Sequence, residues 1–234
     1  MFSRSLLITT AVLLATLGVV PAFADTIAII GTGDVAGALG PRFAEQGHTI
    51  VYGSREPGRS SVNELVQRSG KGASATTQAE AAAQASIVVL AVPGMMVEEI
   101  TKGLGDLSGK IIIDPTNPLK GEMGRLTHGA ETSNAEIIQA AAPNAFVVKA
   151  FNALNYQTMA DPASAGGPVS IPLAGDDSNA TATVARLVEG MGLEPIDVGP
   201  LENARWVEGM LILWINNRYG GTRESFDFHL RKTR

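Results

Sequence analysis

Short apolar runs alternate with longer amphipathic stretches along most of the chain. Four runs have the length and β-branched content of buried strands, at residues 26–30, 86–92, 110–113 and 145–151. Weaker strands are expected at 49–52, 170–174 and 194–198. Helical periodicity covers residues 34–46, 61–67, 77–83, 95–102, 134–141 and 178–191. This alternation predicts an α/β fold built on a doubly wound parallel sheet.

The alternation loosens after Phe151, where residues 152–168 lack periodicity and carry two prolines and two glycines. We therefore expect a larger domain at 25–152 and a small C-terminal lobe at 153–234.

The lobe contains an unusually apolar helix, expected at 201–219. Two interpretations of its large side chains stay open: a core for the lobe, or a contact between two subunits in a homodimer. The side chains concerned are Trp206, Met210, Leu211 and Trp214.

The N-terminus has the pattern of a secretory leader. Arg4 precedes an apolar run at 6–20, and Ala22-Phe23-Ala24 has the small-x-small form of a signal-peptidase site. We expect a signal peptide at 1–24, cleavage after Ala24, and a periplasmic or secreted protein without stable membrane insertion. An uncleaved anchor is the alternative, although the run is short for a bilayer span.

Composition and charge exclude several classes of function. Against 18 Lys and Arg stand 23 Asp and Glu, so the chain lacks the basic stripe that nucleic-acid binding requires. It has no Cys, and its three His show no metal-ligand spacing. We expect neither a nucleic-acid partner nor a metal.

A glycine-rich turn follows the first strand after the leader. Gly31-Thr32-Gly33-Asp34-Val35-Ala36 joins this strand to a helix, as the G-x-G-x-x-G/A fingerprint of a Rossmann-like dinucleotide-binding fold requires. Gly31 permits the tight turn, and Gly33 lets the backbone approach a pyrophosphate at the helix N-terminus. A merely tight turn is the alternative. Pro41 lies inside the helix, so we expect a kink or a shortened helix.

The end of the second strand indicates which dinucleotide is bound. Sites for NAD usually carry Asp or Glu there, but this chain has Gly53 and Ser54, followed by Arg55 and Arg59. A hydroxyl beside two guanidinium groups favours the 2'-phosphate of NADP(H). Alternatively, both arginines are solvated loop charges, or Glu56 pairs with one of them.

Catalytic acids or bases are not evident from spacing, so the catalytic residues stay unknown. No Tyr-x-x-x-Lys pair and no Gly-x-Ser-x-Gly turn occurs. This fits hydride exchange between two ring systems, where positioning provides most of the acceleration. It fits equally a binding protein without chemistry.

Six motifs resemble, in order, those of the NADP oxidoreductases that depend on the deazaflavin coenzyme F420. They are residues 27–33, Gly53-Ser54-Arg55, residues 90–93, Asp114-Pro115-Thr116-Asn117-Pro118, residues 148–152 and residues 174–177. The chain also resembles the related reductase domain of the STEAP metalloreductases. This resemblance implies NADP(H) as cofactor, and F420 or a flavin as a small-molecule hydride acceptor bound against the C-terminal lobe.

The resemblance also implies roles for individual residues. Thr32, Gly33 and Val35 would line the pyrophosphate, together with the neighbouring Gly31 and Asp34 of the fingerprint. Ser54, Arg55 and Arg59 would hold the 2'-phosphate, and Val92 and Pro93 would pass beside the ribose and diphosphate. The nicotinamide end and the acceptor cleft would be framed by Asn117, Ala150, Phe151 and Asn152.

Several of these residues have a second interpretation. Asn117 fits an ordinary turn and Asn152 a loop cap. His128 is placed either near the acceptor cleft or in a solvated loop, and Lys149 is expected to extend from its strand end to solvent.

The sequence therefore predicts an NADP(H)-dependent oxidoreductase that exchanges hydride with a deazaflavin or flavin-like acceptor. An exported dinucleotide-binding protein without turnover, acting as a sensor or partner module, is the alternative from another class. A flavin or ferric reductase of the STEAP type is a third possibility.

Overall fold

The computed structural model describes residues 24–70, 72–120, 125–128, 130–219 and 226–233. The expected leader lies outside these residues except for Ala24, which is exposed. Its cleavage and the export of the protein stay predictions.

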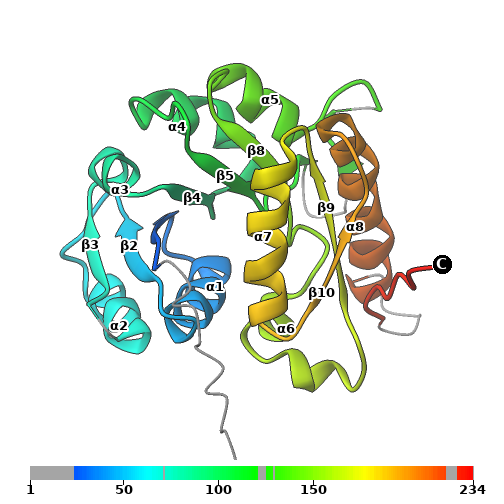
Figure 1. The fold of residues 1–234 in the computed structure, drawn as a ribbon, viewed down its shortest axis with the longest axis horizontal. Helices are drawn as coiled ribbons and strands as arrows, with labels where there is room; N and C mark the ends of the chain where they lie inside the picture. The colour runs from blue at the N-terminus through cyan, green and yellow to red at the C-terminus, as the bar shows by residue number, and fades with distance from the viewer. Residues whose placement is uncertain (1–23, 71, 121–124, 129, 220–225, 234) are drawn as a thin grey trace, which may run out of the picture.

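An eight-stranded sheet forms the centre of the molecule, in the order β10-β9-β8-β5-β4-β1-β2-β3 (Figure 1). The strands are β1 (Thr26–Ile30), β2 (Thr49–Gly53), β3 (Ser74–Thr76), β4 (Ile87–Leu90), β5 (Ile111–Asp114), β8 (Phe146–Lys149), β9 (Ser170–Gly175) and β10 (Glu194–Asp197). A separate antiparallel pair joins β6 (Leu119–Lys120) to β7 (Arg125–Leu126).

Helices cover both faces of the sheet. They are α1 (Asp34–Glu45), α2 (Ser60–Ser69), α3 (Gln78–Gln84), α4 (Val97–Gly103), α5 (Asn134–Ala141), α6 (Tyr156–Ala160), α7 (Ser178–Gly190) and α8 (Ala204–Tyr219). Short 3-10 turns are η1 (Gly94–Met96), η2 (Pro162–Ala165) and η3 (Leu201–Asn203). All seven expected strands and seven expected helices are present, and their ends differ by a few residues.

The sheet is doubly wound, as predicted, but not wholly parallel. Strands β3, β2, β1, β4, β5 and β8 are parallel to one another. β9 pairs with β8 in the antiparallel direction, and β10 is parallel to β9. A parallel neighbour for β8 would require a crossover that brings the chain back to the edge of the sheet where β8 begins. The segment with α6 and η2 instead leads into β9 from the edge where β8 ends, so β9 runs in the opposite direction. Because β9 and β10 extend the same sheet, the expected division after Asn152 stays a prediction.

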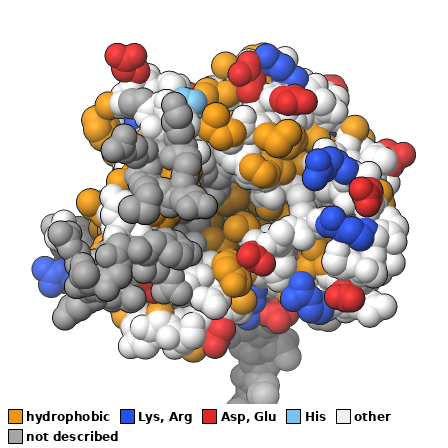
Figure 2. All heavy atoms as spheres, turned by 180° about the vertical axis from the view of Figure 1, so that it is seen from behind, with side chains coloured by type: hydrophobic (Ala, Val, Ile, Leu, Met, Phe, Trp, Pro, Cys, Tyr) orange, Lys and Arg blue, Asp and Glu red, His pale blue; other side chains and the backbone are white. Residues whose placement is uncertain are grey.

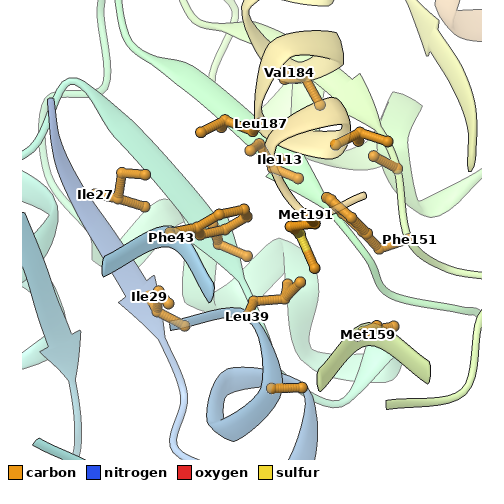
Figure 3. Close-up of a cluster of buried hydrophobic side chains, with 14 of the residues drawn as sticks. Ile27, Ile29, Leu39, Phe43, Ile113, Phe151, Met159, Val184, Leu187 and Met191 are labelled. Atoms are coloured by element: carbon orange, nitrogen blue, oxygen red, sulfur yellow. The ribbon is translucent and has the colours of Figure 1, made fainter. Parts of the chain in front are cut away.

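Alternating side chains of β1 build the two cores, one on each face of the sheet. Ile27 and Ile29 pack on one face with Leu39 and Phe43 of α1 and with α7, as Figure 3 shows. Ala28 and Ile30 pack on the other face with side chains of α3, α4 and α5. Burial on both faces explains why β1 is apolar throughout.

Two details differ from the sequence expectations. Helix α1 continues to Glu45 with Pro41 inside, so it is not shortened there; burial of Leu39 and Phe43 on both sides of the proline holds it against the core. In α8, Leu211 is buried but Trp206 is 64% exposed, so Trp206 does not belong to a core. Neither finding tests a homodimer.

The surface gives no sign of a strongly charged region on the face shown in Figure 2, where basic and acidic side chains are interspersed over the described part. In the described ranges, no helix combines the length and the apolar character needed to cross a membrane.

Candidate functional site

The turn after β1 depends on a glycine. Gly31 has φ +110°, and its N–H donates to the carbonyl oxygen of Gly53 at the end of β2 (2.9 Å). A Cβ at Gly31 would collide with the backbone carbonyl of Ala91, which follows β4. The packing of three strand ends therefore requires glycine here.

Gly33 is different, because nothing in the protein requires a glycine there. Its φ is −87°, and an ideal Cβ would meet no atom within 4 Å. Gly33 is the N-cap of the twelve-residue helix α1, whose first N–H groups have no intrahelical acceptor. The open space beside this helix end is a cradle that a Cβ would fill, and it fits a diphosphate.

A cavity of about 430 Å³ opens from this cradle. It lies where the carboxyl ends of β1, β2 and β4 meet, which is the switch point of the sheet order and the usual ligand position in doubly wound folds. The lining residues are Gly31, Thr32, Gly33, Gly53, Ser54, Arg55, Glu56, Arg59, Gln78, Ala91, Val92, Pro93, Met96, Glu99 and Ile100. The predicted residues of the phosphate turn, the arginine loop and the segment after β4 therefore line one cavity.

Two arginines on the β2 side of the cavity form no ion pair with any described residue. Arg55 is exposed, and Arg59 donates from Nη2 to Thr32 Oγ1 (3.1 Å), which joins the arginine loop to the phosphate turn. Ser54 is buried, and its Oγ accepts from the N–H of Glu56 (3.1 Å). Glu56 thus neutralises neither arginine, and both guanidinium groups are available to an anion.

Two predicted residues of the fingerprint do not line the cavity. Asp34 is exposed in the first turn of α1, and Val35 packs against the core. Any contribution of theirs to a diphosphate would come from their backbone N–H groups.

The residues predicted for the nicotinamide end lie together, outside this cavity, where β5 and β8 end. Asn117 Nδ2 donates to the backbone oxygen of Asn152 (2.9 Å), and Asn152 Nδ2 donates to Asn117 Oδ1 (3.0 Å). Asn152 Nδ2 also donates to the backbone oxygen of Val207 in α8 (3.0 Å). Asn152 Oδ1 is buried and has no hydrogen-bond partner among the described residues.

The side chains of Ala150 and Phe151 point into the protein, so a role at the nicotinamide end stays a prediction for their backbone. Both are buried, and the ring of Phe151 lies edge-on to Phe43 with centroids 6.3 Å apart. Phe151 has φ +65°, a conformation that costs an L residue about 1–2 kcal/mol. The ring lies in the core cluster beside Phe43 and Met191 (Figure 3).

His128 is half-buried and contacts the protein rather than solvent alone. Its Nε2 lies 3.1 Å from Asn134 Oδ1. The loop on either side, residues 121–124 and 129, lies outside the described residues, so a role in the acceptor cleft stays a prediction.

Lys149 does not reach solvent, contrary to the sequence expectation. It is fully buried, and Nζ donates to Asp114 Oδ2 (2.8 Å), Glu208 Oε1 (2.7 Å) and the backbone oxygen of Thr116 (2.5 Å). Glu208 lies on α8 and also accepts from the N–H of Asn134 (2.9 Å). Burial, opposed by the Lys149 ammonium, raises the pKa of Glu208 to about 7.

Several site residues were missed from the sequence. Gln78, Met96, Glu99 and Ile100 line the cavity from the helices beside it. Their only sequence signal is their position just after β4 or at the start of α3. In the described ranges no group of His, Asp or Glu side chains could hold a metal ion.

Comparison with known proteins identifies the family. The family model "NADP oxidoreductase coenzyme F420-dependent" matches residues 26–118. The F420-dependent NADP reductase of Methanothermobacter thermautotrophicus is 30% identical over 210 residues, which cover 81% of this chain and 88% of that protein. This chain belongs to the F420-dependent NADP reductase family.

A solved structure and a second relative agree with this assignment. The structure of a putative F420-dependent NADP reductase from Arthrobacter sp. FB24 has a TM-score of 0.82 and 31% identity, covering 89% of this chain and all of that one. Metalloreductase STEAP3 of Rattus norvegicus is 34% identical over 194 residues, 82% of this chain. The matched part spans only 37% of that metalloreductase.

Proposed function

We propose that this member of the family binds NADP(H) in the cavity beside Gly33 and exchanges hydride with a deazaflavin or flavin-like acceptor. One observation carries the proposal: the open cradle at the N-terminus of α1 lies in the same cavity as two guanidinium groups that pair with no acid among the described residues. A dinucleotide with a diphosphate and a 2'-phosphate has negative charge at both positions.

The chain's own residues would bind and orient the cofactor. Backbone N–H groups at the start of α1 would hold the diphosphate, beside Thr32, which accepts a hydrogen bond from Arg59. Arg55, Arg59 and Ser54, which line the same cavity, would hold the 2'-phosphate. The bound nicotinamide would supply the hydride chemistry, and the protein's contribution is to orient it.

Asn117 and Asn152 are proposed to hold the nicotinamide end. Their mutual hydrogen bonds fix two amide groups at the ends of β5 and β8. Asn152 Oδ1, which has no described partner, is an acceptor suited to a carboxamide N–H.

For the acceptor, we propose F420 first, because the reductases named above are F420-dependent by their names. The likeness to a metalloreductase supports a flavin or ferric reductase as the second candidate. An exported binding protein without turnover is the candidate from another class, and the expected leader supports it because reduced nicotinamides are made in the cytoplasm.

One experiment separates these functions. NADPH oxidation is followed at 340 nm with F420, FMN, FAD and ferric chelates in turn, beside calorimetry with NADPH and NADH. Rapid oxidation with F420 supports the proposal, and oxidation only with flavin or ferric chelate supports the second candidate. Binding of NADPH without oxidation supports the exported binder, and no heat with either dinucleotide refutes all three.

A further inference from the structure

The buried ammonium of Lys149 joins three segments that are far apart in the sequence. Its three hydrogen bonds go to Asp114 at the end of β5, to the backbone of Thr116, and to Glu208 on α8. An ammonium has three N–H donors, so each has a partner. Charge-assisted bonds of this kind fix the relative positions of β5, β8 and α8.

Two of these partners are linked to the amide pair at the proposed nicotinamide end, one along the chain and one through Val207. Thr116 precedes Asn117 in the chain. Glu208 follows Val207, whose backbone oxygen accepts from Asn152 Nδ2 (3.0 Å). Through its bond to Thr116, Lys149 fixes the backbone next to Asn117. Through its bond to Glu208, it fixes the turn of α8 that contacts Asn152.

The backbone at Asn152 needs such support. Phe151, with φ +65°, is the one non-glycine residue of positive φ in the described ranges, and Asn152 follows it directly. Strained backbone persists only where the surrounding structure determines it. Here the surrounding contacts are the packing of the Phe151 ring in the core and the hydrogen bonds of Asn152 with Asn117 and Val207.

Glu208 is not explained by packing alone. The buried side of α8 consists of Ala204, Val207, Glu208 and Leu211, so the carboxyl group lies in the middle of an otherwise apolar stripe. Replacing a whole buried ion pair by apolar side chains of similar volume is often neutral or stabilising, so stability alone does not require the pair. The acid is therefore better explained by the placement it imposes.

We propose that Lys149 and Glu208 are positioning residues, which set Asn117 and Asn152 in the geometry that hydride transfer requires. The effect on hydride transfer rests on the proposed function. The placement of the two amides by Lys149 and Glu208 does not.

The kinetic test compares three substitutions of Glu208 with a control on the same helix. Glu208→Leu removes the acceptor, Glu208→Asp displaces it, and Glu208→Gln keeps an oxygen within reach of Lys149. Arg205→Gln is the control, because it breaks the other ion pair of α8, with Glu136 on α5 (2.5 Å), and does not touch Lys149.

For Glu208→Leu we expect kcat of NADPH oxidation to fall by about tenfold or more, with KM for NADPH unchanged within about twofold, because misplacement affects the reacting end and not the phosphate cavity. The kcat of Glu208→Asp should lie between those of Glu208→Leu and wild type. If Glu208→Leu does not fold, Glu208→Asp provides the test. Glu208→Gln should keep kcat close to that of wild type. An unchanged kcat in the Leu and Asp variants, or an equal fall in Arg205→Gln, overturns the proposal.

A second measurement is independent of activity. The side-chain amide NMR signals of Asn117 and Asn152 should shift in Glu208→Leu and Glu208→Asp but not in Arg205→Gln. Absence of a shift overturns the positioning role. If the wild-type protein does not oxidise NADPH with any of the acceptors tested, the proposed hydride transfer fails. The NMR signals then decide by themselves whether Lys149 and Glu208 place the two amides.

Discussion

Glu208 provides the sharpest test of the structure in solution, because its burial links protein stability to pH. The side chain is 1% exposed, and burial raises its pKa from 4.5 to about 7. At about 1.4 kcal/mol per pH unit, this difference corresponds to about 3 kcal/mol between the protonated and ionised forms.

The sign follows from proton binding. Between pH 4.5 and about 7, the folded protein keeps a proton on Glu208 that the unfolded chain has released. Stability from this group is therefore present at low pH and is lost as the pH rises to about 7. Glu208→Gln mimics the protonated form and does not titrate. Its free energy of unfolding relative to wild type should therefore rise by about 3 kcal/mol as the pH increases from 4 to 8.

Urea denaturation of both proteins at half-unit pH intervals measures this difference, and contributions of other groups cancel in the subtraction. Glu136→Gln is a control of opposite sign, because the hydrogen bond from Arg205 lowers the pKa of Glu136. The free energy of unfolding of Glu136→Gln should be lower than that of wild type at neutral pH, and this difference should shrink as the pH falls below 4.5. A flat difference curve for Glu208→Gln would show that Lys149 and the backbone of Asn134 fully offset the burial of the carboxyl group, and that its pKa is not raised.

Three further predictions concern the dinucleotide cavity. Arg55→Ala should weaken NADPH binding about tenfold or more by calorimetry and leave NADH binding unchanged; equal losses for both would contradict the 2'-phosphate assignment. Gly33→Val should keep the wild-type melting temperature within a few degrees, because the nearest space is open, but should lose most NADPH binding; undiminished binding would place the diphosphate elsewhere. Gly31→Ala should instead unfold the protein or lower its stability by about 3 kcal/mol or more, because its Cβ meets the Ala91 carbonyl at φ +110°; a normal denaturation curve would mean that this turn differs from the one described.

Most of the fold could be predicted from the sequence because buried parallel strands are apolar throughout and helices carry a 3.6-residue period. The phosphate turn could be predicted because its residues, Gly31 to Ala36, are contiguous in the sequence and follow a strand directly. β3 was missed because its three residues, Ser74–Thr76, are too few for a pattern. The direction of β9 was missed because it depends on where the chain returns to the sheet, which periodicity does not report.

The polar cluster at the strand ends could not be predicted in this way. A lysine in an apolar run reads as a strand-end residue whose amine reaches water. Its carboxylate partners, Asp114 and Glu208, are 35 and 59 residues away. Only the three-dimensional arrangement shows that Lys149 donates hydrogen bonds to both of them.

The junction between β8 and β9 has a consequence for how the molecule comes apart. Only two residue pairs join these strands, Val148 with Gly175 and Lys149 with Ala174. Yet Val184 and Leu187 of α7 share one core with Phe43 of α1. The unit of β9, β10 and α7 is thus attached by side chains more than by a backbone ladder, so shortening the Phe43 side chain would loosen this unit from α1 without breaking any hydrogen bond among the six parallel strands.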